Sequence, residues 1–104
     1  MKIILTTYPN INSAKKIANE LLKKKLAACV NISSQINSYY RWQEQIQNNY
    51  EFLTIIKTDL TKLLKVKKII QKTHPYDNPE IIEINGKILN KEYSEWFNES
   101  LGIF

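Results

Sequence analysis

The chain has 104 residues and a formal net charge of +5 at pH 7. This length fits one domain and leaves no room for a second core, so residues 1–104 are expected to form a single domain. Because no run of about 18 apolar residues occurs and the apolar stretch at the start is short, we expect neither a membrane span nor a signal peptide. Cys29 is the only cysteine and cannot form an intrachain disulfide, which favours a cytoplasmic location.

Charge is distributed unevenly along the chain. Residues 1–75 carry 13 basic and 4 acidic side chains, whereas residues 76–104 carry 2 basic and 6 acidic ones. The excess of positive charge in residues 1–75 suits anionic partners such as nucleic acid. However, 14 of the 15 basic residues are lysines, and most fall on two predicted helices. Solvated helix surfaces explain this pattern more simply, so we do not expect nucleic-acid binding.

The first quarter of the chain predicts a strand followed by a helix. Lys2–Thr7 is a short apolar run that ends before Pro9, which is typical of a strand. Asn12 or Ser13 can cap the following helix by accepting an early backbone N–H. The apolar residues of this helix recur at helical spacing and form one stripe: Ala14, Ile17, Ala18, Leu21 and Leu22.

A long hairpin is expected next. From residue 30 to residue 42 the apolar period changes to two, which predicts a strand of about 13 residues, longer than the usual five or six. Five larger side chains share one face of this strand: Val30, Ile32, Ile36, Tyr40 and Trp42. After a polar turn at residues 43–45, residues 46–58 return as a third strand. Such a pair must project past its own core and present an aromatic edge to a partner chain.

The second half predicts a helix, a strand and a helix. Thr58 or Asp59 can cap a helix that ends near Thr73, ahead of Pro75. Its apolar residues are Leu60, Leu63, Leu64, Val66, Ile69 and Ile70. Residues 79–84 predict a fourth strand with Ile82 and Ile84 facing the core, and residues 89–101 a weaker helix. The order is typical of an α+β, ferredoxin-like β-α-β-β-α-β sandwich with a C-terminal helix and a long central hairpin.

Several kinds of functional site are excluded. With glycines only at positions 86 and 102, no phosphate-binding glycine loop is possible. No CxxC or HExxH pattern occurs, so a closed structural zinc site within one chain is excluded. Tyr50 and Phe52 share a strand face but lack the glycine pattern of an RNA-recognition module.

The segment His74-Pro75-Tyr76-Asp77-Asn78-Pro79-Glu80 is the most unusual part of the sequence. It combines the only histidine with a tyrosine and two carboxylates, while its prolines hold the backbone extended. Glu51 and Lys57 share one face of the third strand, so we expect them to pair. Together, Lys57, Glu51, His74 and Tyr76 would form a polar pocket for a small anion or a metal-bound ligand.

These residues together resemble the CutA family of divalent-cation-tolerance proteins. The resemblance covers nearly the whole chain in the right order, and its most specific piece is the His-Pro-Tyr-x-x-Pro-Glu run at residues 74–80. The other matching pieces are Leu26-Ala27-Ala28-Cys29-Val30-Asn31-Ile32, Ser38-Tyr39-Tyr40-Arg41-Trp42 and Ile56-Lys57-Thr58.

The resemblance implies a compact homotrimer of ferredoxin-like subunits, similar in shape to PII signalling proteins. The long strands 30–42 and 46–58 would contact neighbouring subunits, and polar residues would gather in clefts between subunits. The matching positions are Tyr40, Trp42, Glu51, Lys57, His74, Tyr76 and Glu80. The family is linked to tolerance of divalent metals, copper binding is known for some members, and no catalytic reaction is firmly attached to it.

Three departures from the family pattern bear on these expectations. Asp77 stands where glutamate is common, and Glu44 stands where a turn glycine is usual. Thr6 and Thr73 stand where some members have a cysteine and a second histidine. His74 is then the one remaining soft ligand, so we expect no obligatory cofactor and only weak binding of a divalent metal such as copper.

Three functions follow from this reading. The first is a trimeric, non-enzymatic protein of divalent-metal response that binds a metal ion or small ligand between subunits. The second is an enzyme that uses His74, Tyr76, Glu51 and Lys57 for acid–base chemistry on a small anion. The third is a basic, ferredoxin-like module that binds nucleic acid.

Overall fold

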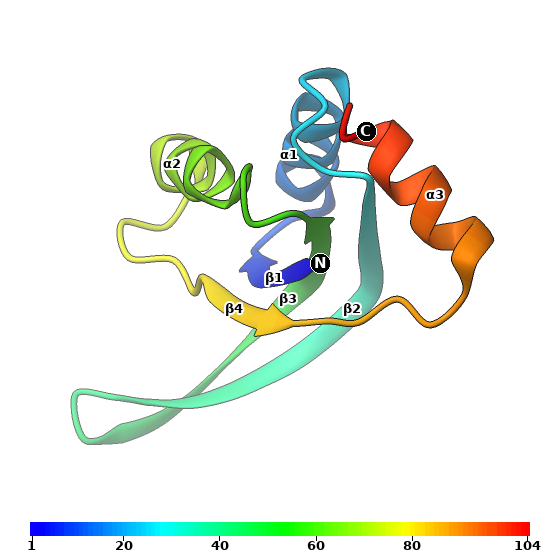
Figure 1. Cartoon of the computed structure of the whole chain (residues 1–104). Helices are drawn as coiled ribbons and strands as arrows, with labels where there is room; N and C mark the ends of the chain where they lie inside the picture. Colours follow the sequence, from blue (N-terminus) through cyan, green and yellow to red (C-terminus); the bar gives the residue numbers. More distant parts are fainter.

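The computed structural model describes all 104 residues and contains every predicted element in the predicted order (Figure 1). The elements are β1 (Lys2–Tyr8), α1 (Ile11–Lys23), β2 (Cys29–Trp42), β3 (Gln45–Thr58), α2 (Leu63–Thr73), β4 (Ile82–Asn85) and α3 (Lys91–Ser100). None of the three helices is both long and apolar enough to cross a membrane.

The four strands form one antiparallel sheet in the order β2-β3-β1-β4. Helices α1 and α2 lie together on one face of this sheet (Figure 1). The α+β, ferredoxin-like arrangement predicted from the sequence is therefore confirmed. β2 and β4 are the outer strands, and each leaves one row of backbone N–H and C=O groups without a partner strand.

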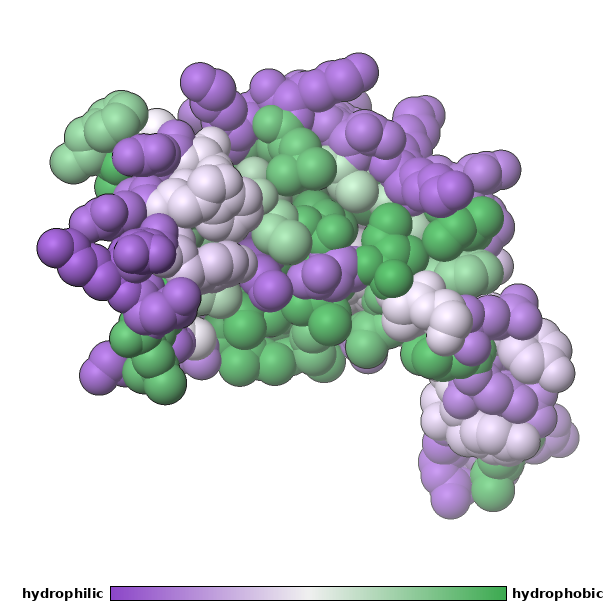
Figure 2. Space-filling view, turned by 90° about the vertical axis from the view of Figure 1, so that its right-hand side faces the viewer, coloured by the Kyte–Doolittle hydropathy of each residue, from purple (hydrophilic) through white to green (hydrophobic).

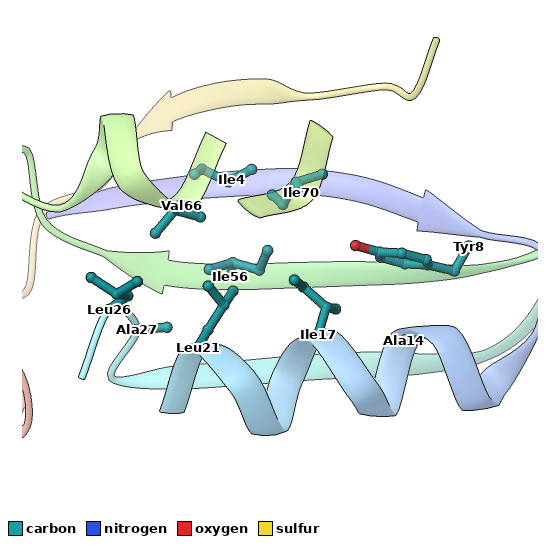
Figure 3. Close-up of a cluster of buried hydrophobic side chains, with 10 residues drawn as sticks. All are labelled: Ile4, Tyr8, Ala14, Ile17, Leu21, Leu26, Ala27, Ile56, Val66 and Ile70. Carbon is teal, nitrogen blue, oxygen red and sulfur yellow. The ribbon is translucent and has the colours of Figure 1, made fainter. Parts of the chain in front are cut away.

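The main core lies between the sheet and the two helices (Figure 3). β1 and β3 contribute Ile4, Tyr8 and Ile56, and the helices contribute the apolar residues of their inner faces. These residues are Ala14, Ile17 and Leu21 from α1, and Val66 and Ile70 from α2. Full burial of one such aliphatic side chain stabilises the fold by about 1.5–3 kcal/mol. A smaller cluster joins Phe97 and Leu101, at the end of α3, to Ala28.

Both predicted helix caps are wrong. The side chain of Asn10 caps α1 by accepting the Ser13 backbone N–H at 2.8 Å, so the helix begins earlier than its apolar stripe suggested. The Asp59 carboxylate instead accepts the Thr61 backbone N–H at 2.9 Å and closes a turn. Because this turn delays α2 until Leu63, Leu60 and also Leu64 are exposed instead of lining the core.

A β-bulge in β2 contradicts the prediction that its larger side chains all share one face of the strand. Ile32 pairs with Thr54, but Gln35 pairs with Phe52, so β2 contains one extra residue in this interval. Val30 and Ile32 therefore face the helices, while Ile36, Tyr40 and Trp42 lie on the opposite face of the sheet. A bulge reverses side-chain alternation because that alternation has a period of two.

The prediction that Ile82 and Ile84 face the core is also wrong. They pair with Leu5 and Ile3, which lie on the side of the sheet away from α1 and α2. Together these side chains form what we call the open face: Ile3, Leu5, Leu53, Ile55, Ile82 and Ile84. Figure 2 shows hydrophobic residues gathered over the middle of one side of the molecule, with hydrophilic residues around them.

The β2–β3 hairpin extends well beyond the core. Pairing of β1 with β3 ends at Phe52, so residues 37–50 form a projecting arm whose two strands pair only with each other (Figure 1). The molecule measures 48 × 26 × 22 Å as a result. At the tip, Gln43 and Glu44 form a two-residue turn with φ values of 50° and 64°. Both residues thus adopt the left-handed conformation that favours glycine.

The positive φ of Glu44 in the hairpin turn predicts that a substitution there stabilises the protein. Replacing Glu44 by glycine is expected to raise the free energy of unfolding by about 1 kcal/mol, because glycine lacks the Cβ that strains this conformation. Chemical denaturation monitored by circular dichroism measures the change. Glu44→Ala is the matched control, since it removes the carboxylate but keeps the Cβ. An equal gain in both variants would show that charge, and not backbone strain, is responsible.

Candidate functional site

A polar cleft of about 440 Å³ lies where the projecting arm leaves the sheet. It includes four of the predicted site residues: Tyr40, Glu51, Tyr76 and Glu80. Tyr40 comes from β2, Glu51 from β3, and the other two from the connection between α2 and β4. The prolines at 75 and 79 were expected to hold this connection extended, and the connection brings Tyr76 to β3.

Glu51 is the buried carboxylate of the cleft. Only 8% of its surface is exposed, and its Oε2 accepts a hydrogen bond from the Tyr76 hydroxyl at 2.8 Å. Burial, followed by the interaction with Glu51, raises the pKa of Tyr76, so the phenol remains a donor at neutral pH. A charged carboxylate removed from water needs such a donor, and this bond ties the 74–80 segment to β3.

His74 lies behind the cleft, at the C-terminal end of α2, with 9% of its surface exposed. Its Nε2 is 2.7 Å from the Thr7 carbonyl oxygen, and its Nδ1 is 3.0 Å from the Tyr76 backbone nitrogen. A carbonyl can only accept and an amide N–H can only donate, so Nε2 carries the proton and Nδ1 accepts. The ring also stacks on Tyr8, with 4.3 Å between ring centroids.

This geometry bears on the metal-ligand role expected of His74, which stays a prediction. Both ring nitrogens are occupied by backbone groups, so the imidazole has no free lone pair to offer a metal. Within the single chain, no three His, Cys, Asp or Glu side chains come close enough together to hold a metal ion. His74 instead fixes the position of Tyr76 relative to the end of β1.

The predicted pairing of Glu51 with Lys57 is wrong within one chain. Both lie on β3 and on the same face, but six residues of extended strand place their Cα atoms about 20 Å apart. Lys57 lines a different pocket, beside the start of α3, and forms no ion pair. Two side chains on the same face of a long strand therefore need not be in contact.

Trp42 is also remote from the cleft of its own chain. It pairs with Gln45 at the tip of the arm, about 20 Å along β3 from Glu51, and 59% of its surface is exposed. The structure thus brings together four of the seven predicted residues, places His74 directly behind them and leaves Trp42 and Lys57 apart.

Four further residues line the cleft: Thr7, Ser38, Tyr39 and Asn78. Asn78 was identified within the 74–80 segment but not assigned a role, and Thr7 precedes Tyr8 at the end of β1. The cleft holds two carboxylates and no cationic side chain. It therefore suits a cation or a hydroxyl-rich ligand better than a small anion, which was one of the two ligands expected from the sequence beside a metal-bound ligand. A larger groove of about 640 Å³, between α2 and β4, contains none of the seven residues.

The environment of His74 predicts a pH dependence of stability. Burial lowers its pKa below the usual 6.5, although the hydrogen bond to Thr7 and the charge of Glu51 partly oppose the change. The unfolded chain therefore binds a proton more readily than the folded one. Stability is complete above about pH 6.5 and falls as the pH decreases toward the folded pKa, by at most about 1.4 kcal/mol per pH unit.

Denaturation curves at pH values from 7.5 to 5.5 test this expectation. The difference between the native chain and His74→Gln isolates the histidine, because glutamine keeps a neutral donor but does not titrate. We expect the native protein to lose more stability than the variant over this range. Parallel pH profiles would contradict the assignment of a buried neutral imidazole.

Comparison with known proteins agrees with this fold. A sequence model of the CutA1 divalent ion tolerance protein family matches residues 2–100. The divalent-cation tolerance protein CutA of Thermus thermophilus is 37% identical over 101 residues, which cover 97% of this chain and 98% of that protein. The crystal structure of the divalent ion tolerance protein CutA1 from Ehrlichia chaffeensis is 39% identical, covers 96% of this chain and 94% of its own, and superposes with a TM-score of 0.90.

A third relative has the same extent of similarity. The structure described as the periplasmic divalent cation tolerance protein CutA from Archaeoglobus fulgidus is 37% identical, with a TM-score of 0.90, and the match covers 97% of this chain and 99% of that one. Sequence and structure agree over almost the full length in all three cases. The chain therefore belongs to the CutA1 divalent ion tolerance family.

Proposed function

We propose that this protein is a non-enzymatic homotrimer of divalent-cation tolerance, which binds a divalent cation in clefts between its subunits through oxygen ligands. The observation that carries the proposal is the cleft itself, where the buried carboxylate of Glu51 is joined by Glu80, three phenols and an amide, without a neighbouring cationic side chain. The trimer and the ligand are argued separately below.

The surface of the single chain supports association. Its accessible area is 7198 Å², whereas a compact monomer of 12.3 kDa has about 6,100 Å². The difference reflects the projecting arm and the open face, where Ile82 and Ile84 are each more than two-fifths exposed. An apolar sheet face beside unpaired strand edges is a surface that soluble proteins cover.

The two free edges of the sheet support a closed ring. β2 and β4 are different strands, so pairing β2 of one subunit with β4 of the next is a heterologous contact that can close around a rotation axis. Strands 30–42 and 46–58 would then lie against neighbours, as the family resemblance implies. Three is the subunit number that the resemblance implies.

Association also explains the separated site residues. Glu51, Tyr40 and Thr7 lie on the same side of the sheet as the open face, so the cleft borders the proposed subunit interface. Trp42 on the arm and Lys57 at the other end of β3 cannot reach the cleft of their own chain. In the trimer, we infer that they contribute to the cleft of a neighbouring subunit.

The donor set favours a hard cation over copper. Carboxylate, phenol and amide oxygens suit ions such as Mg²⁺, Mn²⁺ or Ca²⁺, whereas copper prefers imidazole or sulfur ligands. His74 has both nitrogens engaged, and the Cys29 thiol lies on β2 beside Lys57 and Asn31, away from the cleft. Weak binding is expected because only two carboxylates are present.

The enzymatic alternative receives less support. A general base must have a lone pair that faces the substrate, and Nδ1 of His74 is directed at the Tyr76 backbone N–H. For the location we propose the cytoplasm, which the single unpaired thiol of Cys29 supports, although the Archaeoglobus fulgidus relative is described as periplasmic.

The assembly can be tested by analytical ultracentrifugation at low micromolar concentration. We expect a species of three times the 12.3 kDa chain mass. Trp42→Asp should dissociate or destabilise it, because a carboxylate would replace the aromatic ring at the interface. Leu22→Asp, at an exposed position on α1 in the helical layer, should leave the mass unchanged. A native species at the mass of one or two chains would contradict the trimer.

Cation binding can be tested by isothermal titration with Mn²⁺. We expect weak saturable binding that falls at least about tenfold in Glu51→Gln, which removes the charge but still accepts from Tyr76. Glu95→Gln, at an exposed position on α3, is the matched control and should bind as the native chain does. Binding that is unchanged in Glu51→Gln, or a tight copper site that requires His74, would overturn the proposal.

A further inference from the structure

The groove between α2 and β4 plays no part in the function proposed above. Its volume of about 640 Å³ lies in the range of small-molecule binding sites. The lining includes Ile4, a core residue on the helix side of β1, and Glu83, its partner on β4. The groove therefore lies on the side of the sheet that carries α1 and α2, opposite the open face. Association through the open face would leave that side of the sheet uncovered.

The two ends of the groove differ in polarity. Leu60, Leu63 and Leu64 line it at the start of α2, and Leu60 and Leu64 expose 66% and 62% of their surface. Lys67 and Gln71 line it over the next two turns of the helix, and their spacing of four residues places them on one helix face. The rise of the helix from Leu64 to Gln71 is about 10 Å. An apolar end and a polar end thus lie about 10 Å apart.

Lys67 is the one charged group of the groove without a partner. The carboxylate of Glu83 is paired with Lys2, whose Nζ lies 2.9 Å from Oε2. Lys67 forms no ion pair, and α2 carries three further lysines and no acidic residue. The Lys67 ammonium and the Gln71 amide can both donate hydrogen bonds. Charge complementarity at this end of the groove therefore favours an anionic group, and a carboxylate can accept from both donors.

We propose that the groove between α2 and β4 binds an aliphatic carboxylate of medium chain length. The alkyl chain would cover Leu60 and Leu64, which removes apolar surface of both the protein and the ligand from water. The carboxylate would accept hydrogen bonds from Lys67 and Gln71. A small polar anion would leave the leucines exposed, and an aliphatic cation would face the Lys67 ammonium, so neither satisfies both ends of the groove.

Isothermal titration of the full chain with octanoate at pH 7.5 tests the site, with butanoate as the probe of a shorter chain. We expect saturable binding of octanoate and at least tenfold weaker binding of butanoate. Leu64→Asn should weaken octanoate binding at least tenfold, because it removes apolar surface from the groove. Lys67→Gln should weaken it at least threefold, because it removes the charge but keeps a donor. Both side chains are exposed, so the fold is expected to survive, and circular dichroism checks it.

Two exposed positions outside the groove supply the matched controls. Leu22→Asn, on α1, changes an exposed leucine in the same way, and Lys65→Gln removes a charge from the same helix. We expect both variants to bind octanoate as the native chain does. An equal loss in Lys65→Gln and Lys67→Gln would show attraction by the whole basic helix and would overturn the assignment of the carboxylate to Lys67.

Three further results would overturn the proposal. The first is heat that never saturates with octanoate, and the second is equal affinity for octanoate and butanoate. The third is unchanged octanoate binding in Leu64→Asn. Because the groove and the polar cleft lie on opposite sides of the sheet, none of these results would bear on cation binding through Glu51.

Discussion

The structure depends on a mismatch of strand length. β2 and β3 have 14 residues each, whereas β1 has seven and β4 has four. α1 and α2 cover only the part of the sheet that contains β1, so the rest of the hairpin has no core of its own chain to pack against. The projecting arm results from this mismatch, whereas the two unpaired edges belong to the outer strands β2 and β4. A hairpin of this length is marginal alone in water, which is the physical reason to expect partner subunits.

His74 connects the layers of the fold. Its ring stacks on Tyr8 at the end of β1, its Nε2–H donates to the Thr7 carbonyl, and its Nδ1 accepts the Tyr76 N–H. Tyr76 then reaches Glu51 on β3. The 74–80 segment, which carries two prolines, is thereby bound to β1 through the imidazole and to β3 through the Tyr76 hydroxyl. The histidine that the sequence singled out as a ligand thus links the end of α2 to β1.

The element order could be predicted because it depends on local patterns. The change from a period of 3.6 to a period of two locates α1 and β2, and Pro75 ends α2 at Thr73 as expected. The wrong predictions concern which face of the sheet a side chain lies on, because a shift of one residue along a strand changes that face. The extra residue between Ile32 and Gln35 reverses the faces of the whole outer half of β2. Likewise, Ile82 and Ile84 alternate as a buried strand would, but their partners Leu5 and Ile3 point away from the helices.

The sequence by itself determined the fold class, the long hairpin, the family resemblance and the importance of the 74–80 segment, because each is carried by neighbouring residues or by regular spacing. Only the tertiary structure decided which of these residues meet. Glu51 joins Tyr76, 25 positions away along the chain, and not Lys57 on its own strand. It also decided that both nitrogens of His74 bond to backbone groups. Hydrogen-bond partners and strand register are long-range properties, set when distant segments pack, and no local pattern records them.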